Sequence, residues 1–202
     1  MTDPLRMFLV LRRGAVETLE RAAVLGGAAA VACVRSFEID PEWHERPGKV
    51  CLRARNPAQW EAVLEEPHAL AGDAQGEAVA ALPPRRRSQR GPLLERLQAM
   101  SGDLGPAPEE LGDAGPGVVT YVLNPELEMS SGKVVAQVAH AAVMAAAALP
   151  AWAEAGAPGR LVSPRGFAEL AARGDLAARV VDAGLTEVAP GTVTVLALPP
   201  TG

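Results

Sequence analysis

Short apolar runs and longer alanine-rich segments follow one another in the same order twice along this chain. The runs "MFLVLRR" (residues 7–13) and "VVTYVLNP" (residues 118–125) each read as a buried strand that leads into an alanine-rich segment. A second strand, a helix carrying Trp60 or Phe167, and a closing strand that ends in Leu-Pro-Pro then follow in each half. This pattern predicts two β–α–β–α–β units.

The two halves also align residue by residue, which favours an internal duplication over a loose similarity between any two α/β segments. Aligning Val10-Leu11 with Val122-Leu123 needs no gap for the next twenty residues, and Arg21 then falls on Lys133. We therefore expect an α/β protein of two tandem small three-layer units, each a mixed β-sheet flanked by helices. The expected boundaries are 1–104 for the degenerate unit, 105–117 for a Gly-, Pro- and acid-rich linker, and 118–202 for the second unit.

Polar residues on the first helix of the second unit are the first candidate for chemistry. In "GKVVAQVAHA", Lys133, Gln137 and His140 lie within about 60° of one another on a helical wheel, among valines and alanines. Buried polar side chains need partners, so this narrow face is expected to line a cleft. The first half has Leu25 and Ala28 where the second has Gln137 and His140.

A turn and a strand near the end of the chain supply the second candidate. Pro190-Gly191 fits the centre of a type II turn, in which glycine takes a positive φ. Strict alternation along the following strand then places Thr192, Thr194 and Leu196 on one face. Before the turn, the residues able to take part in catalysis are Asp182 and Thr186. Carboxylate, hydroxyl, amide, imidazole and ammonium groups together suit hydrolysis of an activated ester better than redox chemistry.

Charge and composition narrow the possible partners. The net charge is −5, and residues 103–202 hold 5 Lys+Arg against 11 Asp+Glu, which argues against general binding of nucleic acid by this half. One basic cluster could contact RNA phosphates or be a solvated connector; its arginines are Arg85, Arg86, Arg87 and Arg90. Cys33 and Cys51 read as free thiols, and the three histidines have no metal-site spacing. We expect a cytoplasmic protein with no membrane span, no metal and no cofactor.

Residues 118–198 carry a resemblance to a known enzyme family. "VLNPELEMSSGKVVAQVAHAAVMA" and "DAGLTEVAPGTVTVLAL" resemble the two defining motifs of the second, archaeal/eukaryotic-type family of peptidyl-tRNA hydrolases. The resemblance implies a small mixed sheet flanked by helices and metal-free hydrolysis of the ester between a peptide and the terminal ribose of tRNA. Peptidyl-tRNA is then the expected partner, and the two halves would form a pseudo-dimer within one chain.

The same resemblance assigns site residues and shows departures from the family. The catalytic residues it implies are Lys133, Asp182, Thr186 and Thr194, and the substrate-binding ones are Gln137, His140, Thr192 and Gly191. Asn124 and Glu126 stand where the family usually has Arg and Asp. The sequence ends at "LPPTG", where the family adds a helix and an edge strand; in the first half "GPLLERLQAMSGDL" has a similar pattern.

Two further hypotheses compete with the peptidyl-tRNA hydrolase. A non-catalytic RNA- or protein-binding protein could retain the fold and the cleft, as the acidic second half and Asn124 suggest. A hydrolase of a smaller ester would need only a weakly basic surface. The Lys-Gln-His and Asp-Thr-Thr sets favour an enzyme.

Overall fold

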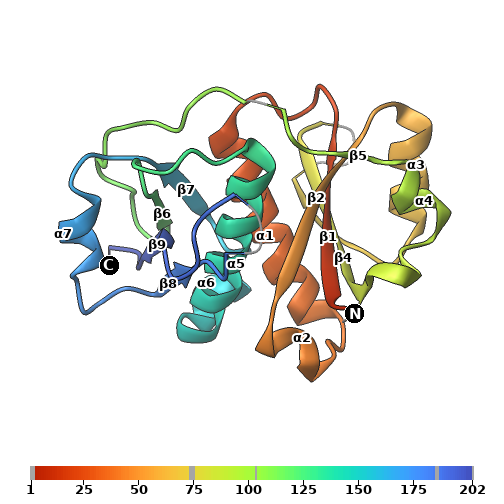
Figure 1. Cartoon of the computed structure of the whole chain (residues 1–202). Helices are drawn as coiled ribbons and strands as arrows, with labels where there is room; N and C mark the ends of the chain where they lie inside the picture. Colours follow the sequence, from red (N-terminus) through yellow and green to blue (C-terminus); the bar gives the residue numbers. More distant parts are fainter. Residues whose placement is uncertain (1–2, 73–75, 103, 185–186, 202) are drawn as a thin grey trace.

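Two mixed β-sheets, one in each half of the chain, form the framework of the molecule (Figure 1). The structure is a computed structural model that describes residues 3–72, 76–102, 104–184 and 187–201. The elements of the first unit are β1 (Leu5–Arg12), α1 (Leu19–Ser36), α2 (Pro41–Glu45), β2 (Gly48–Ala54), α3 (Pro57–Glu65), β3 (Ala69–Gly72), β4 (Ala78–Arg86), α4 (Gly91–Arg96) and β5 (Gln98–Ala99). Those of the second are β6 (Val119–Leu123), α5 (Ser131–Ala148), α6 (Pro150–Glu154), β7 (Gly159–Val162), α7 (Phe167–Ala171), β8 (Ala178–Val181) and β9 (Val193–Leu198).

The strands of the two sheets are connected in the same way. The first sheet has the order β3-β4-β1-β2-β5, and the second has the order β7-β6-β9-β8, which is the same sequence of equivalent strands without β5. In each sheet the first strand pairs parallel with the second and antiparallel with the closing strand. The predicted fold class, two tandem mixed-sheet units with helices, is confirmed. The shared topology is what a duplication would produce, and the duplication itself stays a prediction.

The sequence pattern missed one strand in each unit. β3 and β8 each have four residues and pair antiparallel with the closing strand, β4 or β9. Such short segments give too few alternating positions to stand out from a loop. The two units therefore share the order β–α–α–β–α–β–β, and the added strand brings its last residue beside the start of the closing strand.

Two long helices lie between the sheets and join the units. α1 and α5 both have 18 residues, and each begins after a hydroxyl N-cap, Thr18 or Ser130, that accepts a hydrogen bond from the backbone N–H three residues later. They pack against each other, and each contacts strands of both sheets. At their crossing a Cβ on Gly26 would lie 2.7 Å from Val135 Cγ1, so the small residue permits the close approach. One hydrophobic core thus spans both units.

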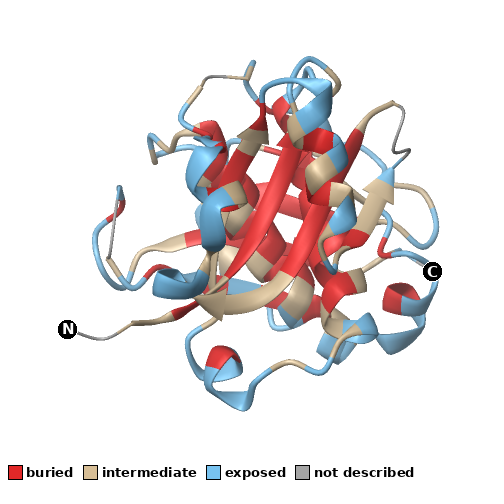
Figure 2. Cartoon of the chain, turned by 90° about the vertical axis from the view of Figure 1, so that its right-hand side faces the viewer, coloured by how far each residue is buried: buried red, intermediate tan, exposed pale blue. Residues whose placement is uncertain are grey.

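The outer face of each sheet is covered separately. Trp60 and Val63 of α3 and Leu94 of α4 pack on the five-stranded sheet. Phe167 and Leu170 of α7 pack on the four-stranded sheet. Figure 2 looks onto the molecule from the side of the first unit and shows buried strands crossing its centre between exposed loops and helix faces. Among the described residues, the helices are all too short or too polar to cross a membrane.

The open edge of the second sheet is covered by the segment between the units. The helix and edge strand expected in the first half are present as α4 and β5, and β5 pairs with β2. The second unit has no equivalent among the described residues, and the connecting segment runs beside β7 instead. Ser163 N–H donates to Pro108 O at 2.7 Å, and the Arg160 guanidinium donates to Gly112 O at 2.8 Å. The Ser163 bond uses a backbone donor directly after the edge strand, and the Arg160 bond anchors the connecting segment through a side chain.

Tyr121 on β6 gives a stability prediction. Its side chain is fully buried, and its hydroxyl has no hydrogen-bond partner among the described residues. An unsatisfied buried hydroxyl is destabilising, so Tyr121→Phe is expected to raise the free energy of unfolding by about 1 kcal/mol. Urea denaturation measures this difference. A loss of about 1 kcal/mol or more would mean that the hydroxyl is satisfied, for instance by a buried water.

Candidate functional site

Four predicted residues meet in one hydrogen-bonded cluster beside the first turns of α5. Lys133 Nζ lies 2.5 Å from Asp182 Oδ2, and Gln137 Nε2 donates to the same oxygen at 2.7 Å. The Thr194 hydroxyl donates to Gln137 Oε1 at 2.8 Å. Asp182, Gln137 and Thr194 are buried, whereas the Lys133 side chain keeps 13% of its surface exposed. We call these four residues the Lys-Asp cluster; Lys133 is its member nearest to solvent.

The backbone around Asp182 fixes the carboxylate. Asp182 N–H donates to Thr192 O at 2.9 Å, and Gly191 N–H donates to Asp182 O at 2.8 Å, which extends the β8–β9 pairing by one step. Gly191 has φ +80°, and Thr192 N–H donates to Ala189 O, as predicted for a type II turn at Pro190-Gly191. Asp182 Oδ1 accepts the Gly184 N–H at 2.7 Å. Hydrogen bonds from the backbone of the loop after β8 and from side chains of α5 therefore fix the carboxylate together.

The orientation of Thr194 differs from the predicted alternation. Leu196 packs on the outer face of the sheet, whereas Thr194 reaches Gln137 on the opposite, α5-facing side. The reason is a β-bulge: Val180 pairs with Val195 and Val181 with Val193, so Thr194 is the extra residue. The bulge turns the Thr194 side chain inward, and the expectation that Thr194 and Leu196 share a face was wrong.

Asn124 holds this bulge and was not assigned a role from sequence. Its backbone N–H donates to Thr194 O at 3.0 Å, and its side-chain amide donates to Val193 O at 3.0 Å. Both carbonyls of the bulged segment thus have partners, as buried backbone groups require. The asparagine that departs from the family pattern is part of the support for Thr194.

The electrostatics of the Lys-Asp cluster keep Asp182 ionised. Burial acts to raise the pKa of Asp182, but the hydrogen bonds from Lys133, Gly184 N–H and Gln137 outweigh it, so the pKa lies below the ordinary value. At neutral pH Asp182 is a carboxylate paired with an ammonium. A carboxylate with a lowered pKa is a weak proton acceptor, and it is better suited to orient its neighbours than to abstract a proton.

The N-terminus of α5 adds two residues that sequence reasoning missed. Ser130 accepts the Lys133 N–H at 3.3 Å, and its own hydroxyl and N–H donate to the two Glu187 oxygens at 2.7 and 2.8 Å. Ser130 thereby ties the loop after β6 to the loop that follows Asp182. The sequence signal was available, because a serine three residues before the first helical polar residue is a common N-cap.

The remaining predicted residues lie around the Lys-Asp cluster, except Thr186, which is not among the residues that the structure describes. Thr192 and Gly191 contribute backbone groups to the Asp182 turn. His140 forms no hydrogen bond among the described residues; burial and the nearby charge of Lys49 in the first unit lower its pKa to about 4, although Asp182 acts in the opposite sense. It is therefore a neutral imidazole close to the other unit. Thr186 lies outside the described residues.

The first unit has a different ion pair at the equivalent helix position. Arg21, which aligns with Lys133, pairs with Glu77 at 2.7 Å, and both side chains are nearly half exposed. Leu25 and Ala28 replace the amide and the imidazole of the second unit. A solvated pair of this kind contributes little energy and is not preorganised by burial. This makes Arg21 a matched control for Lys133.

The arginines proposed for RNA contact are largely engaged with acidic side chains. Arg85 pairs with Glu66 at 3.2 Å, Arg86 with Glu42 at 2.7 Å, and Arg90 lies 3.7 Å from Glu95. Arg85 and Arg86 also pair with residues at the beginning of β1, whereas the Lys-Asp cluster lies by the end of β6, the equivalent strand. The cluster of arginines and the Lys-Asp cluster are thus at opposite ends of equivalent strands.

The two cysteines are buried, unreactive thiols. Cys33 and Cys51 are free, as predicted; both are also buried, and burial raises the pKa of each thiol to about 12. Thiolate is the reactive form, so neither is a candidate nucleophile at neutral pH. Within the described ranges, no three His, Cys, Asp or Glu side chains gather as they would around a metal ion.

Comparison with known proteins identifies part of the second unit. The family model described as Peptidyl-tRNA hydrolase PTH2 matches residues 118–158. This segment, less than half of the chain, is therefore similar to that family. It contains β6, α5 and α6, and therefore Lys133, Gln137 and His140, whereas Asp182 and Thr194 lie beyond it. No solved structure matches the chain.

Proposed function

We propose that the chain hydrolyses the ester between a peptide and the 3′-terminal ribose of tRNA. The observation that carries the proposal is the Lys133–Asp182 pair, 2.5 Å apart, which joins a helix of the PTH2-like segment to the loop after β8. Sequence motifs separated by nearly fifty residues thus supply two halves of one site. The catalytic roles below belong to the proposal.

The division of roles follows from burial and charge. Lys133 is the partly exposed cation and stabilises the negative charge that develops on the carbonyl oxygen when water attacks. Asp182 holds the ammonium in place and orients the water, with Gln137 and Thr194 fixing its position. The bond between the carbonyl carbon and the ribose oxygen then breaks, and the ribose oxygen takes a proton that derives from water.

The first unit supports the second structurally in this proposal. We take residues 1–104 as a degenerate copy, 105–117 as the linker and 118–202 as the active copy. The degenerate copy lacks the buried pair and shares its core with the active one, so one chain forms a pseudo-dimer. Monomeric behaviour in solution is the corresponding expectation.

A second candidate is a protein that binds without catalysis or acts on a smaller ester. It is favoured by the acidic side chains of the second unit and by Asn124, which serves the bulge instead of supplying a positive charge. The deciding experiment incubates the full chain with peptidyl-tRNA and with a small aminoacyl ester. Release of peptide from tRNA supports the proposal, cleavage of only the small ester supports a narrower hydrolase, and cleavage of neither supports a binding protein.

Salt dependence tests the proposed phosphate contacts of the first unit. If Arg85, Arg86, Arg87 and Arg90 contact RNA, replacing all four with Gln should flatten the log–log dependence of affinity on salt by about 0.7 per contact for single strands. Filter binding over a salt series measures the slope, and circular dichroism checks the fold, because three of these arginines also pair with acids. An unchanged slope restricts them to intramolecular pairing.

A further inference from the structure

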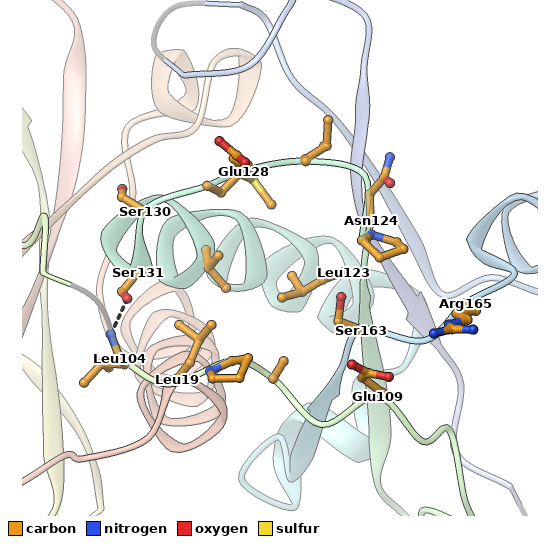
Figure 3. Close-up of a pocket in the computed structure, with 16 residues that line it drawn as sticks. Leu19, Leu104, Glu109, Leu123, Asn124, Glu128, Ser130, Ser131, Ser163 and Arg165 are labelled. Atoms are coloured by element: carbon orange, nitrogen blue, oxygen red, sulfur yellow. Dashed lines mark hydrogen bonds between the residues drawn. The ribbon is translucent and has the colours of Figure 1, made fainter.

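A cavity of about 810 Å³ lies beside the Lys-Asp cluster and is built from both units (Figure 3). Its walls are the connecting segment around residues 104–109, the loop 124–130, and the ends of β6 and β7. Leu19 at the start of α1 and Ser131 at the start of α5 both line it, and Ser131 Oγ accepts the Leu104 N–H at 2.8 Å. The start of the connecting segment is thus anchored to the start of α5 at the wall of the cavity.

The lining of the cavity suits an organic group more than a phosphate. Most of its side chains are apolar, among them Leu104, Leu123, Leu127, Met129 and Val134. The volume lies in the range of small-molecule sites, which are typically apolar with a few placed polar groups. The polar side chains of the lining include Ser130, Ser131 and Ser163, of which Ser130 and Ser131 already form hydrogen bonds within the chain.

Charged side chains at the rim of the cavity favour one charge on the ligand over the other. Glu109 on the connecting segment and Glu128 on the loop after β6 are exposed, and Figure 3 shows them on different walls. Arg165 is the one cation of the lining, and none of the three forms an ion pair within the described part of the chain. The resulting negative rim repels phosphate and attracts an ammonium group.

The cavity adjoins the Lys-Asp cluster without containing it. Lys133 and Asp182 do not line the cavity, whereas Ser130 and Val134 do. Successive helical residues lie about 100° apart, so the cavity and the cluster occupy neighbouring faces of the first turns of α5. Ser130 connects the two, since it lines the cavity and also caps the turn that carries Lys133.

We propose that this cavity binds the peptide part of the ester substrate, with apolar side chains inside and the free N-terminal ammonium at Glu109 and Glu128. The inference rests on the proposed hydrolysis of peptidyl-tRNA and adds to it the site of the non-nucleotide half. The phosphates of the tRNA stay outside the acidic rim. A peptide enters the cavity while its ester carbonyl lies at Lys133.

Peptide binding by the full chain tests the cavity without depending on hydrolysis. Isothermal titration calorimetry with trileucine amide and with its N-acetyl form should show tighter binding of the free ammonium form, by about fivefold for each contributing carboxylate. Glu109→Gln together with Glu128→Gln should abolish this preference. The matched pair Glu110→Gln and Glu126→Gln, whose side chains do not line the cavity, should leave it unchanged.

A substitution that fills the cavity provides a second test of the proposed peptide site. Ser163→Trp should weaken binding of trileucine amide by about tenfold or more, because the indole occupies space inside the cavity. Urea unfolding checks that Ser163→Trp keeps its fold. If Ser163→Trp proves to be destabilised, the test rests on the glutamate variants instead. Failure of trileucine amide to bind, or equal binding by the parent protein and both sets of variants, overturns the proposal. Peptide binding without hydrolysis would instead overturn the proposed function and leave the cavity assignment intact.

Discussion

Lys133→Ala and Asp182→Ala should each lower kcat/KM for peptidyl-tRNA by on the order of 10²-fold or more. Lys133 is the cation next to solvent in the Lys-Asp cluster, and Asp182 is the buried carboxylate that fixes it at 2.5 Å. Loss of the ammonium removes stabilisation of the developing oxyanion. Loss of the carboxylate lets the ammonium and the Gln137 amide move away from their positions. Steady-state rates of peptide release measure both effects.

The control for this prediction comes from the other unit. Arg21→Ala removes the aligned cation, which forms a half-exposed pair with Glu77, and should leave kcat/KM nearly unchanged. Asp182→Asn tests the charge alone, because the amide retains the shape of the side chain. Thermal unfolding of each variant separates lost chemistry from lost structure. Equal effects of Arg21→Ala and Lys133→Ala on turnover would refute the assignment of the site.

Gly132→Val should lower the free energy of unfolding by about 3 kcal/mol, the upper end of the usual cost of overpacking. A Cβ on Gly132 would lie 2.0 Å from Met100 O, so the helix start and the end of the first unit cannot both keep their places. For a chain of this size the melting temperature should fall by about 2–4 °C per kcal/mol. Calorimetry measures the change.

A second glycine provides the matched comparison. Gly105 also lies between the units, but a Cβ there would meet nothing within 4 Å. Gly105→Val should therefore change the free energy of unfolding by no more than about 0.5 kcal/mol. If both variants were equally stable, the close contact between Gly132 and Met100 would not exist in solution. Because Gly132 precedes Lys133, activity should fall together with stability in Gly132→Val.

The sequence by itself determined the units, the helices and the local chemistry. The repeated order of apolar runs predicted two mixed-sheet units, and Pro190-Gly191 predicted the type II turn that supports Asp182. The helical spacing of Lys133 and Gln137 placed both on one face, and both reach the same carboxylate oxygen. These features depend on a few neighbouring residues, whose periodicity and backbone preferences are independent of distant partners.

Only the tertiary structure decided which way several of these residues point. The bulge at Thr194 depends on pairing with β8 and on Asn124, about seventy positions earlier in the chain, so strict alternation gave the wrong face. His140 lies near Lys49 of the first unit because α5 packs between two sheets. The connecting segment covers β7 and forms one wall of the cavity through hydrogen bonds to residues about fifty positions away in the chain. Register, edge coverage and enclosed space arise from contacts between segments far apart in the chain, which local sequence patterns do not encode.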